Sequence, residues 1–240
     1  MTSPGGILSL AFMRWPPPKA VLTRYAVAWV YLAAFVIAQV TFALLSARSQ
    51  AAVLGWASTN VHNLRRDPAG SLVASAFFAQ GSPAAWPALI ALAMFGAIRV
   101  LGNWRTALVC GAGHVIGTLV SEGIVDYRVS RGLLPAVDRY LVDVGPSYIV
   151  VSAAVVALLY GSWVARGAAA LDLVLLIGPG DIFGGLSHLD VAAVGHVTAI
   201  TVAAVCGSLM VLQLRRRRGQ PQPPPLGEEP GSAVSAGQPG

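Results

Sequence analysis

The chain has 240 residues, of which 55% are hydrophobic and only 11% are charged, and its mean hydropathy is +0.67. A soluble domain carries about 25% charged residues, so this composition excludes an ordinary soluble protein and indicates a polytopic membrane protein. The net charge of +6 requires no nucleic-acid partner, because the positions of the basic residues explain it as a feature of membrane topology.

Six stretches of the chain are apolar enough to cross a bilayer, whose core needs about 20 apolar residues per helix. They are 21–46, 84–101, 106–123, 145–164, 167–182 and 189–212. The first stretch is too long for the core of a cleavable signal peptide and is expected to be retained. The sequence therefore predicts an all-helical bundle of six transmembrane helices.

A long segment, 47–83, separates the first two stretches and is neither fully apolar nor of disordered composition. Its polar run from Ser58 to Pro68 contains several helix-capping residues. This pattern favours short helices that lie at the outer membrane interface.

The two ends of the chain are predicted to face the cytoplasm across the cell membrane. Ten of the sixteen basic residues fall on the side of the termini in a six-span topology, and the positive-inside rule counts only basic residues. The predicted organisation is a cytoplasmic segment 1–20, a membrane domain 21–213, and a basic, proline-rich tail 214–240 whose composition is typical of disorder.

Ser147 and His196 are the residues with the clearest chemical potential. Gly145-Pro146-Ser147 opens the fourth stretch, and His196 lies about two turns into the sixth. Both stretches would cross the bilayer in the same direction, which brings the two side chains to similar depth. A serine hydroxyl needs a base to take its proton, and a histidine within hydrogen-bond reach suffices. An isolated serine is often only a packing residue, whereas a histidine inside a membrane is a functional candidate.

These motifs resemble the rhomboid family of intramembrane serine proteases, in particular its divergent bacterial branch, over residues 21–212. Gly145-Pro146-Ser147 matches the first three positions of the G-x-S-G nucleophile motif, and His196 followed by Gly207 is similar to the sixth helix of the family. The loop 95–105 is similar to the family's turn between the second and third helices, with Arg99 where a Glu is usual. The resemblance implies Ser147 as nucleophile, His196 as general base, transmembrane proteins as substrates, and no cofactor. The histidine spacing matches no metal motif either.

The chain departs from the family pattern at two places that affect the oxyanion site. Residues 86–90 lack the H-x-x-x-N side chains, and Tyr148 replaces the second glycine of G-x-S-G. Backbone N–H groups around Gly145 and Tyr148 are then the expected oxyanion donors, and His114, midway along the third stretch, supplies either a further polar group or a hydrogen bond between helices. The alternative function is a catalytically inactive protein that binds membrane-protein clients.

Gly178-Pro179-Gly180-Asp181 has the form of the G-x-G-D motif of intramembrane aspartyl proteases. That chemistry needs a second carboxylate at the same depth, and the sequence offers no convincing partner for Asp181. We interpret the motif as the end of the fifth helix and the start of a turn.

Overall fold

The computed structural model describes residues 17–80 and 83–218. Six of the helices described overlap the six predicted stretches, namely α2 (Ala26–Ala43), α6 (Trp86–Leu101), α7 (Asn103–Ser130), α8 (Ser147–Tyr160), α9 (Trp163–Ile177) and α10 (Val191–Arg218). The other elements are α1 (Pro18–Arg24), α3 (Ala47–Ala57), α4 (Val61–Arg66), α5 (Pro68–Ser75) and the 3-10 helices η1 (Pro83–Ala85), η2 (Ala136–Tyr140) and η3 (Leu186–His188). The predicted all-helical bundle is confirmed.

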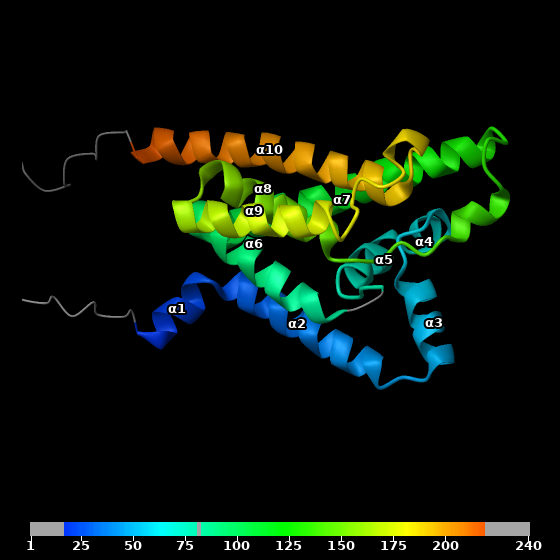
Figure 1. The fold of residues 1–240 in the computed structure, drawn as a ribbon, viewed down its shortest axis with the longest axis horizontal. Coiled ribbons are helices and arrows are strands. Elements are labelled where there is room, and N and C mark those ends of the chain that lie inside the picture. Colours follow the sequence, from blue (N-terminus) through cyan, green and yellow to red (C-terminus); the bar gives the residue numbers. More distant parts are fainter. Residues whose placement is uncertain (1–16, 81–82, 219–240) are drawn as a thin grey trace, which may run out of the picture.

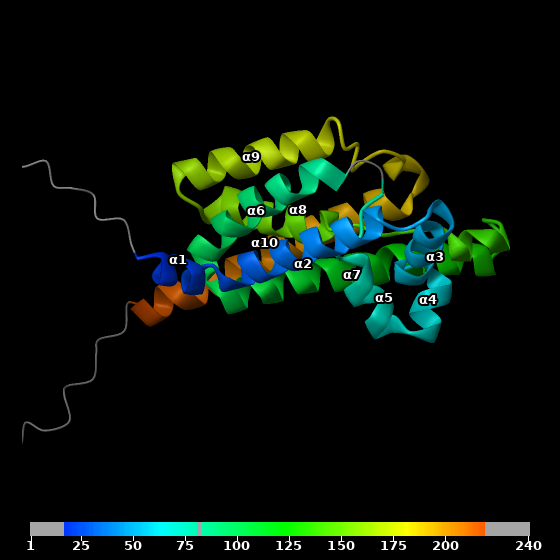
Figure 2. The ribbon, with the colours of Figure 1, turned by 90° about the horizontal axis from the view of Figure 1, so that it is seen from below.

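Helix α8 lies in the middle of the bundle, where it packs against α6, α7, α9 and α10 (Figures 1 and 2). It is apolar on every side, and Val150, Val151 and Ala154 have no exposed surface. A helix that is hydrophobic all round is expected to be buried. Ser147, the first residue of α8, therefore belongs to the central helix of the protein.

Small residues let the helices around α8 approach closely. A Cβ added at Gly117 of α7 would lie 3.0 Å from the carbonyl oxygen of Gly195 in α10. A Cβ added at Gly96 of α6 would lie 2.8 Å from the Cβ of Ala157 in α8. Close backbone contact through small residues is typical of helices that pack within a membrane.

Helix α2 lies at the edge of the bundle against α6 and α7, with most of its apolar surface uncovered. Val30 and Ile37, for example, are 70% and 66% exposed. Helices α2, α7 and α10 are each long and apolar enough to cross a membrane, and α6 and α8 are shorter apolar helices. Lipid is the environment in which such exposed apolar surface is stable.

The first predicted stretch, 21–46, is interrupted at Tyr25, where α1 ends and α2 begins. The side chain of Asn103 bridges the interruption, because its Oδ1 accepts from the N–H of Val27 at 3.1 Å and its Nδ2 donates to the carbonyl of Thr23 at 3.0 Å. These bonds satisfy backbone groups that a break in a helix leaves open. Hydropathy does not predict the break, because the residue that stabilises it lies far away in the sequence, between the second and third predicted stretches.

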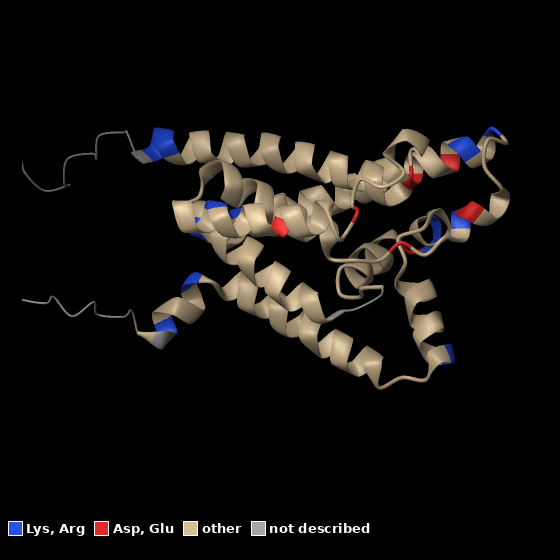
Figure 3. Cartoon of the chain, in the orientation of Figure 1, with Lys and Arg blue, Asp and Glu red and all other residues tan. Residues whose placement is uncertain are grey.

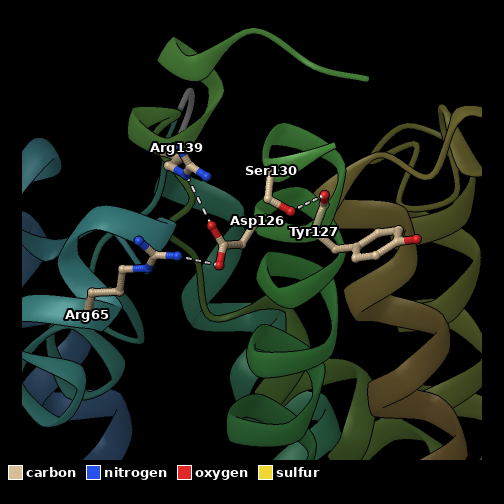
Figure 4. Close-up of polar contacts among 5 residues, drawn as sticks. All are labelled: Arg65, Asp126, Tyr127, Ser130 and Arg139. Atoms are coloured by element: carbon tan, nitrogen blue, oxygen red, sulfur yellow. Dashed lines mark hydrogen bonds and ion pairs between the residues drawn. The ribbon is translucent and has the colours of Figure 1, made fainter. Parts of the chain in front are cut away.

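Helix α7 continues to Ser130, beyond the predicted end at 123. Figure 4 shows how its last turns are held: Asp126 pairs with Arg65 of α4 at 2.6 Å and with Arg139 of η2 at 3.0 Å, and the hydroxyl of Ser130 donates to the carbonyl of Tyr127. The apolar pattern of the sequence ends where these charges begin, but the ion pairs of Asp126 hold the helix in place beyond that point.

The segment between the first two long helices forms the short helices α3, α4 and α5, as the sequence predicts. Each begins at a capping side chain: Ser46, Asn60 and Asp67 accept hydrogen bonds from the first turn of α3, α4 and α5, respectively. The segment is attached to α2 because Tyr31 donates to the carbonyl of Ala76 at 2.8 Å and Gln39 donates to that of Phe77 at 2.9 Å.

Helix α1 and the C-terminal end of α10 lie at the same end of the molecule, and α3, α4 and α5 lie toward the other end (Figure 1). In the part of the chain that the structure describes, the half that contains α1 carries Lys and Arg but almost no Asp or Glu (Figure 3). The exception is Asp172 on α9, near the middle of the molecule. The molecule thus has a basic end, which contains the ends of α1 and α10, and an opposite end of mixed charge.

Candidate functional site

Ser147 is half-buried and occupies the first position of α8. No side chain caps this helix, so the N–H groups of its first turn have no partner within the helix. Such an N-terminus favours a negative charge. The N–H of Gly145 donates to the carbonyl of Ser75 at 3.0 Å, which ties the start of α8 to the end of α5.

His196 lies in the second turn of α10 and is only 4% exposed. Its Nδ1 is 2.6 Å from the carbonyl oxygen of Ala192. Because a carbonyl only accepts, Nδ1 carries the proton, and Nε2 of the neutral ring is left as an acceptor. Nε2 is buried and forms no hydrogen bond of good geometry among residues 17–80 and 83–218, although the backbone of Ile182 lies close to the ring. This is the protonation pattern that a general base needs.

Tyr148 fills the contact between α8 and α10. Its hydroxyl donates to the carbonyl of Val191 at 3.2 Å, and its ring lies edge-on to that of His196, with centroids 4.8 Å apart and planes at 83°. A Cβ added at Gly195 would collide with the phenol. The ring of Tyr148 thus occupies the space that is free because Gly195 has no side chain.

Ser147 and His196 are not joined by a hydrogen bond within the described part of the chain. Both residues lie where α8 and α10 approach each other. The ring of His196 contacts the ring of Tyr148. The Ser147–His196 dyad stays a prediction.

His114 joins α7 to the short helix α5. Its Nε2 lies 2.9 Å from the carbonyl oxygen of Leu72 and 3.3 Å from the hydroxyl of Ser75, so Nε2 carries the proton. Its Nδ1 is buried without a partner in the described residues, and its ring centroid is 6.2 Å from that of Tyr148. Of the two roles considered for His114, the hydrogen bond between helices is the one seen here, and the oxyanion role stays a prediction.

The loop before α8 is held by residues that the sequence did not single out. The N–H of Thr59 donates to the carbonyl of Asp143 at 2.9 Å, and its hydroxyl donates to the Asp143 carboxylate at 3.1 Å. Burial raises the pKa of the Asp143 carboxyl above its usual value, although the Thr59 hydrogen bond acts in the opposite direction. The two partners are 84 positions apart, so only tertiary structure reveals them.

A cavity of about 520 Å³ adjoins the candidate site and is lined by polar groups that include Glu122, Asp143 and Asp190. Its wall also contains Val191 and Ala192, whose carbonyls accept the hydrogen bonds of Tyr148 and His196. Ser147 and His196 are not among its lining residues. Glu122, near the end of the third predicted stretch, is only 4% exposed.

The described residues contain no cluster of three or more His, Cys, Asp or Glu side chains suited to a metal ion. Helix α9 ends at Ile177, immediately before Gly178, as predicted for the Gly-Pro-Gly run. Asp172 in α9 is fully buried, and neither of its carboxylate oxygens has a partner in the described part of the chain.

A bundle of helices that are apolar enough to cross a membrane defines the protein as a polytopic helical membrane protein. The sequence profile of the family described as "Rhomboid-like protein" matches residues 21–216, which is most of the chain. The chain belongs to this family, as the motifs around Ser147 and His196 predicted. No curated protein and no solved structure matches the chain.

Proposed function

We propose that this rhomboid-like protein is an intramembrane serine protease that cleaves membrane-protein substrates, with Ser147 as nucleophile and His196 as general base. The observation that carries the proposal is the buried Nε2 of His196, which is an acceptor without a partner while Nδ1–H is held by Ala192. Leaving a buried polar atom without a hydrogen bond costs about 1–3 kcal/mol. A free lone pair at this place is what a serine nucleophile at the head of α8 requires.

The reaction would follow the steps of serine hydrolysis. The Ser147 hydroxyl attacks the scissile carbonyl, its proton passes to Nε2 of His196, and the N–H groups of the first turn of α8 stabilise the oxyanion. His196 then protonates the leaving amine, and water releases the acyl group from Ser147. Catalytic hydrogen bonds are often formed only in the substrate complex, and here Tyr148 would have to move to let the Ser147–His196 bond form.

The test is covalent labelling of the protein in membranes by a fluorophosphonate probe, which reacts with an activated serine. Wild type should be labelled, whereas Ser147→Ala and His196→Ala should not. Ser152→Ala is the matched control, because Ser152 is a buried serine of the same helix that donates to the carbonyl of Tyr148 at 2.7 Å. Absence of labelling in wild type, or equal labelling of wild type and Ser147→Ala, would remove the protease assignment.

A second candidate, binding of membrane-protein clients without cleavage, is favoured by the position of Tyr148. Its ring occupies the contact between α8 and α10, and the H-x-x-x-N side chains that would support an oxyanion are absent from residues 86–90. Equal cross-linking of a transmembrane peptide to wild type and to Ser147→Ala, without any cleavage product, would support this candidate.

For both candidate functions, the basic end of the molecule faces the cytoplasm of the cell. Residues 21–213 form the membrane domain, and the predicted tail 214–240 begins with the last residues of α10, which ends at Arg218. This orientation follows from the concentration of Lys and Arg at that end. Most of the tail lies outside the described residues. A single cysteine placed in it should resist an impermeant reagent in intact cells, and labelling there would reverse the orientation.

A further inference from the structure

Two adjoining cavities lie at the basic end of the bundle, away from Ser147 and His196. One measures about 400 Å³ and is lined mainly by apolar groups of α1, α6 and α9, among them Val21, Leu92, Phe95, Val164 and Ala168. The other measures about 300 Å³ and is lined by Arg99, Val100, Tyr160, Ser162, Val211, Leu214 and Arg215. Arg99 and Ser162 line both, so the apolar cavity opens directly beside the polar one.

The polar cavity brings two positive charges together from different helices. Arg99 is in the last turn of α6 and Arg215 is near the end of α10, and both are exposed. Neither forms an ion pair in the described part of the chain, whose ion pairs involve Arg65 and Arg139. No Asp or Glu lines either cavity. An anion placed here would therefore meet two guanidinium groups and no like charge.

We propose that these cavities bind one anionic phospholipid, with its phosphate between Arg99 and Arg215 and one acyl chain in the apolar cavity. Arginine is suited to phosphate because its planar group donates two parallel hydrogen bonds. Free phosphate would leave the adjoining apolar surface uncovered, whereas a phospholipid covers both parts at once. The bilayer around this membrane protein supplies such molecules, and basic pockets between membrane helices are known to hold anionic headgroups.

The bound lipid would connect three helices that belong to different parts of the chain. Its phosphate would bridge α6 and α10, and its acyl chain would lie along α6 and α9. A ligand that binds only the folded state stabilises it by an amount that grows with the logarithm of the ligand concentration. This inference does not depend on whether the protein cleaves or only binds its clients.

The experiment is native mass spectrometry of the delipidated full chain titrated with phosphatidylglycerol or phosphatidylcholine of identical acyl chains. Wild type should bind one phosphatidylglycerol in preference to phosphatidylcholine. Arg99→Gln and Arg215→Gln should each weaken that binding by about tenfold or more, the loss expected for one charge-assisted hydrogen bond. Arg216→Gln is the matched control, since this exposed neighbour on α10 lines neither cavity, and it should change the affinity by less than about twofold.

The acyl part of the site is tested separately. Ala168→Phe would place a large ring in the apolar cavity and should weaken binding, whereas Ala170→Phe, on the exposed side of the same helix, should not. Inorganic phosphate at millimolar concentration should fail to compete. Equal affinity for both lipids, equal affinity of Arg215→Gln and Arg216→Gln, or full competition by inorganic phosphate would each overturn the proposal.

Discussion

The contact between Tyr148 and Gly195 offers a quantitative test of how α8 and α10 are packed. A Cβ at Gly195 would collide with the phenol ring, so Gly195→Ala must push the ring or the helices apart. Overpacking of this kind costs about 1–3 kcal/mol of unfolding free energy. Tyr148→Ala removes a side chain of which only 4% is exposed, together with its hydrogen bond to Val191, and should cost about 3–5 kcal/mol.

The two changes should be strongly coupled. Once Tyr148→Ala has emptied the space, the methyl group added by Gly195→Ala enters it without strain, so its cost should fall to near zero in the double variant. The expected coupling free energy is at least about 1 kcal/mol, within the range found for residues in contact. Gly111→Ala is the matched control, because nothing lies within 4 Å of a Cβ at this exposed position of α7. It should be neutral or stabilising, since alanine is the better helix former by about 1 kcal/mol.

The measurement is reversible unfolding by SDS in mixed detergent micelles, carried out on wild type, both single variants, the double variant and the control. If Gly195→Ala were as costly with Tyr148→Ala as with Tyr148 present, the ring would not lie on Gly195. The packing described here for α8 and α10 would then be wrong.

Three further predictions concern carboxylates. The pKa of the Asp143 carboxyl is raised in the folded protein, so the folded state binds this proton more tightly than the unfolded state does. Wild type should therefore lose stability as the pH rises from the ordinary pKa of 3.8 through the raised one. Asp143→Asn should remove that part of the slope when the unfolding free energy is measured against pH. Asp172→Ala should raise the unfolding free energy by about 1–3 kcal/mol, because it removes a buried carboxyl without a hydrogen bond, and a fall in thermal stability would instead mean that the carboxyl has a partner. Asp126→Asn should lower the unfolding free energy by at most about 1 kcal/mol for each of its two ion pairs, and this loss should be smaller in high salt. A larger loss, or one that does not depend on salt, would show that these ion pairs are not exposed to solvent.

The sequence predicted the helical bundle well, because hydropathy and helix length are set by the bilayer and are local properties of the chain. It also predicted the short helices of the segment after α2, whose caps at Asn60 and Asp67 are local signals. The break at Tyr25 and the extension of α7 to Ser130 could not be predicted in this way. They depend on Asn103 and on the ion pairs of Asp126, whose partners lie far away in the sequence.

The same distinction applies to the candidate site. Spacing alone placed Ser147 at the head of one helix and His196 two turns into another, and the structure has both residues in α8 and α10 as expected. Motif reading also marked Tyr148 as a departure from glycine. It could not say where the ring would go, because this depends on the space left by Gly195 on a different helix.

The ring of Tyr148 has two histidines as neighbours, and each of them has one buried nitrogen without a hydrogen bond. Nδ1 of His114 and Nε2 of His196 are both buried and lack partners in the described residues, and the two rings lie 6.2 Å and 4.8 Å from that of Tyr148. Each unpaired acceptor is costly, and a buried polar network that is only partly satisfied is less stable than a complete one. An arrangement of this kind is reasonable if a substrate or client supplies the missing donors when it enters between α8 and α10. Movement of Tyr148 would then be the step common to both candidate functions, and the chemistry of Ser147 would decide between them.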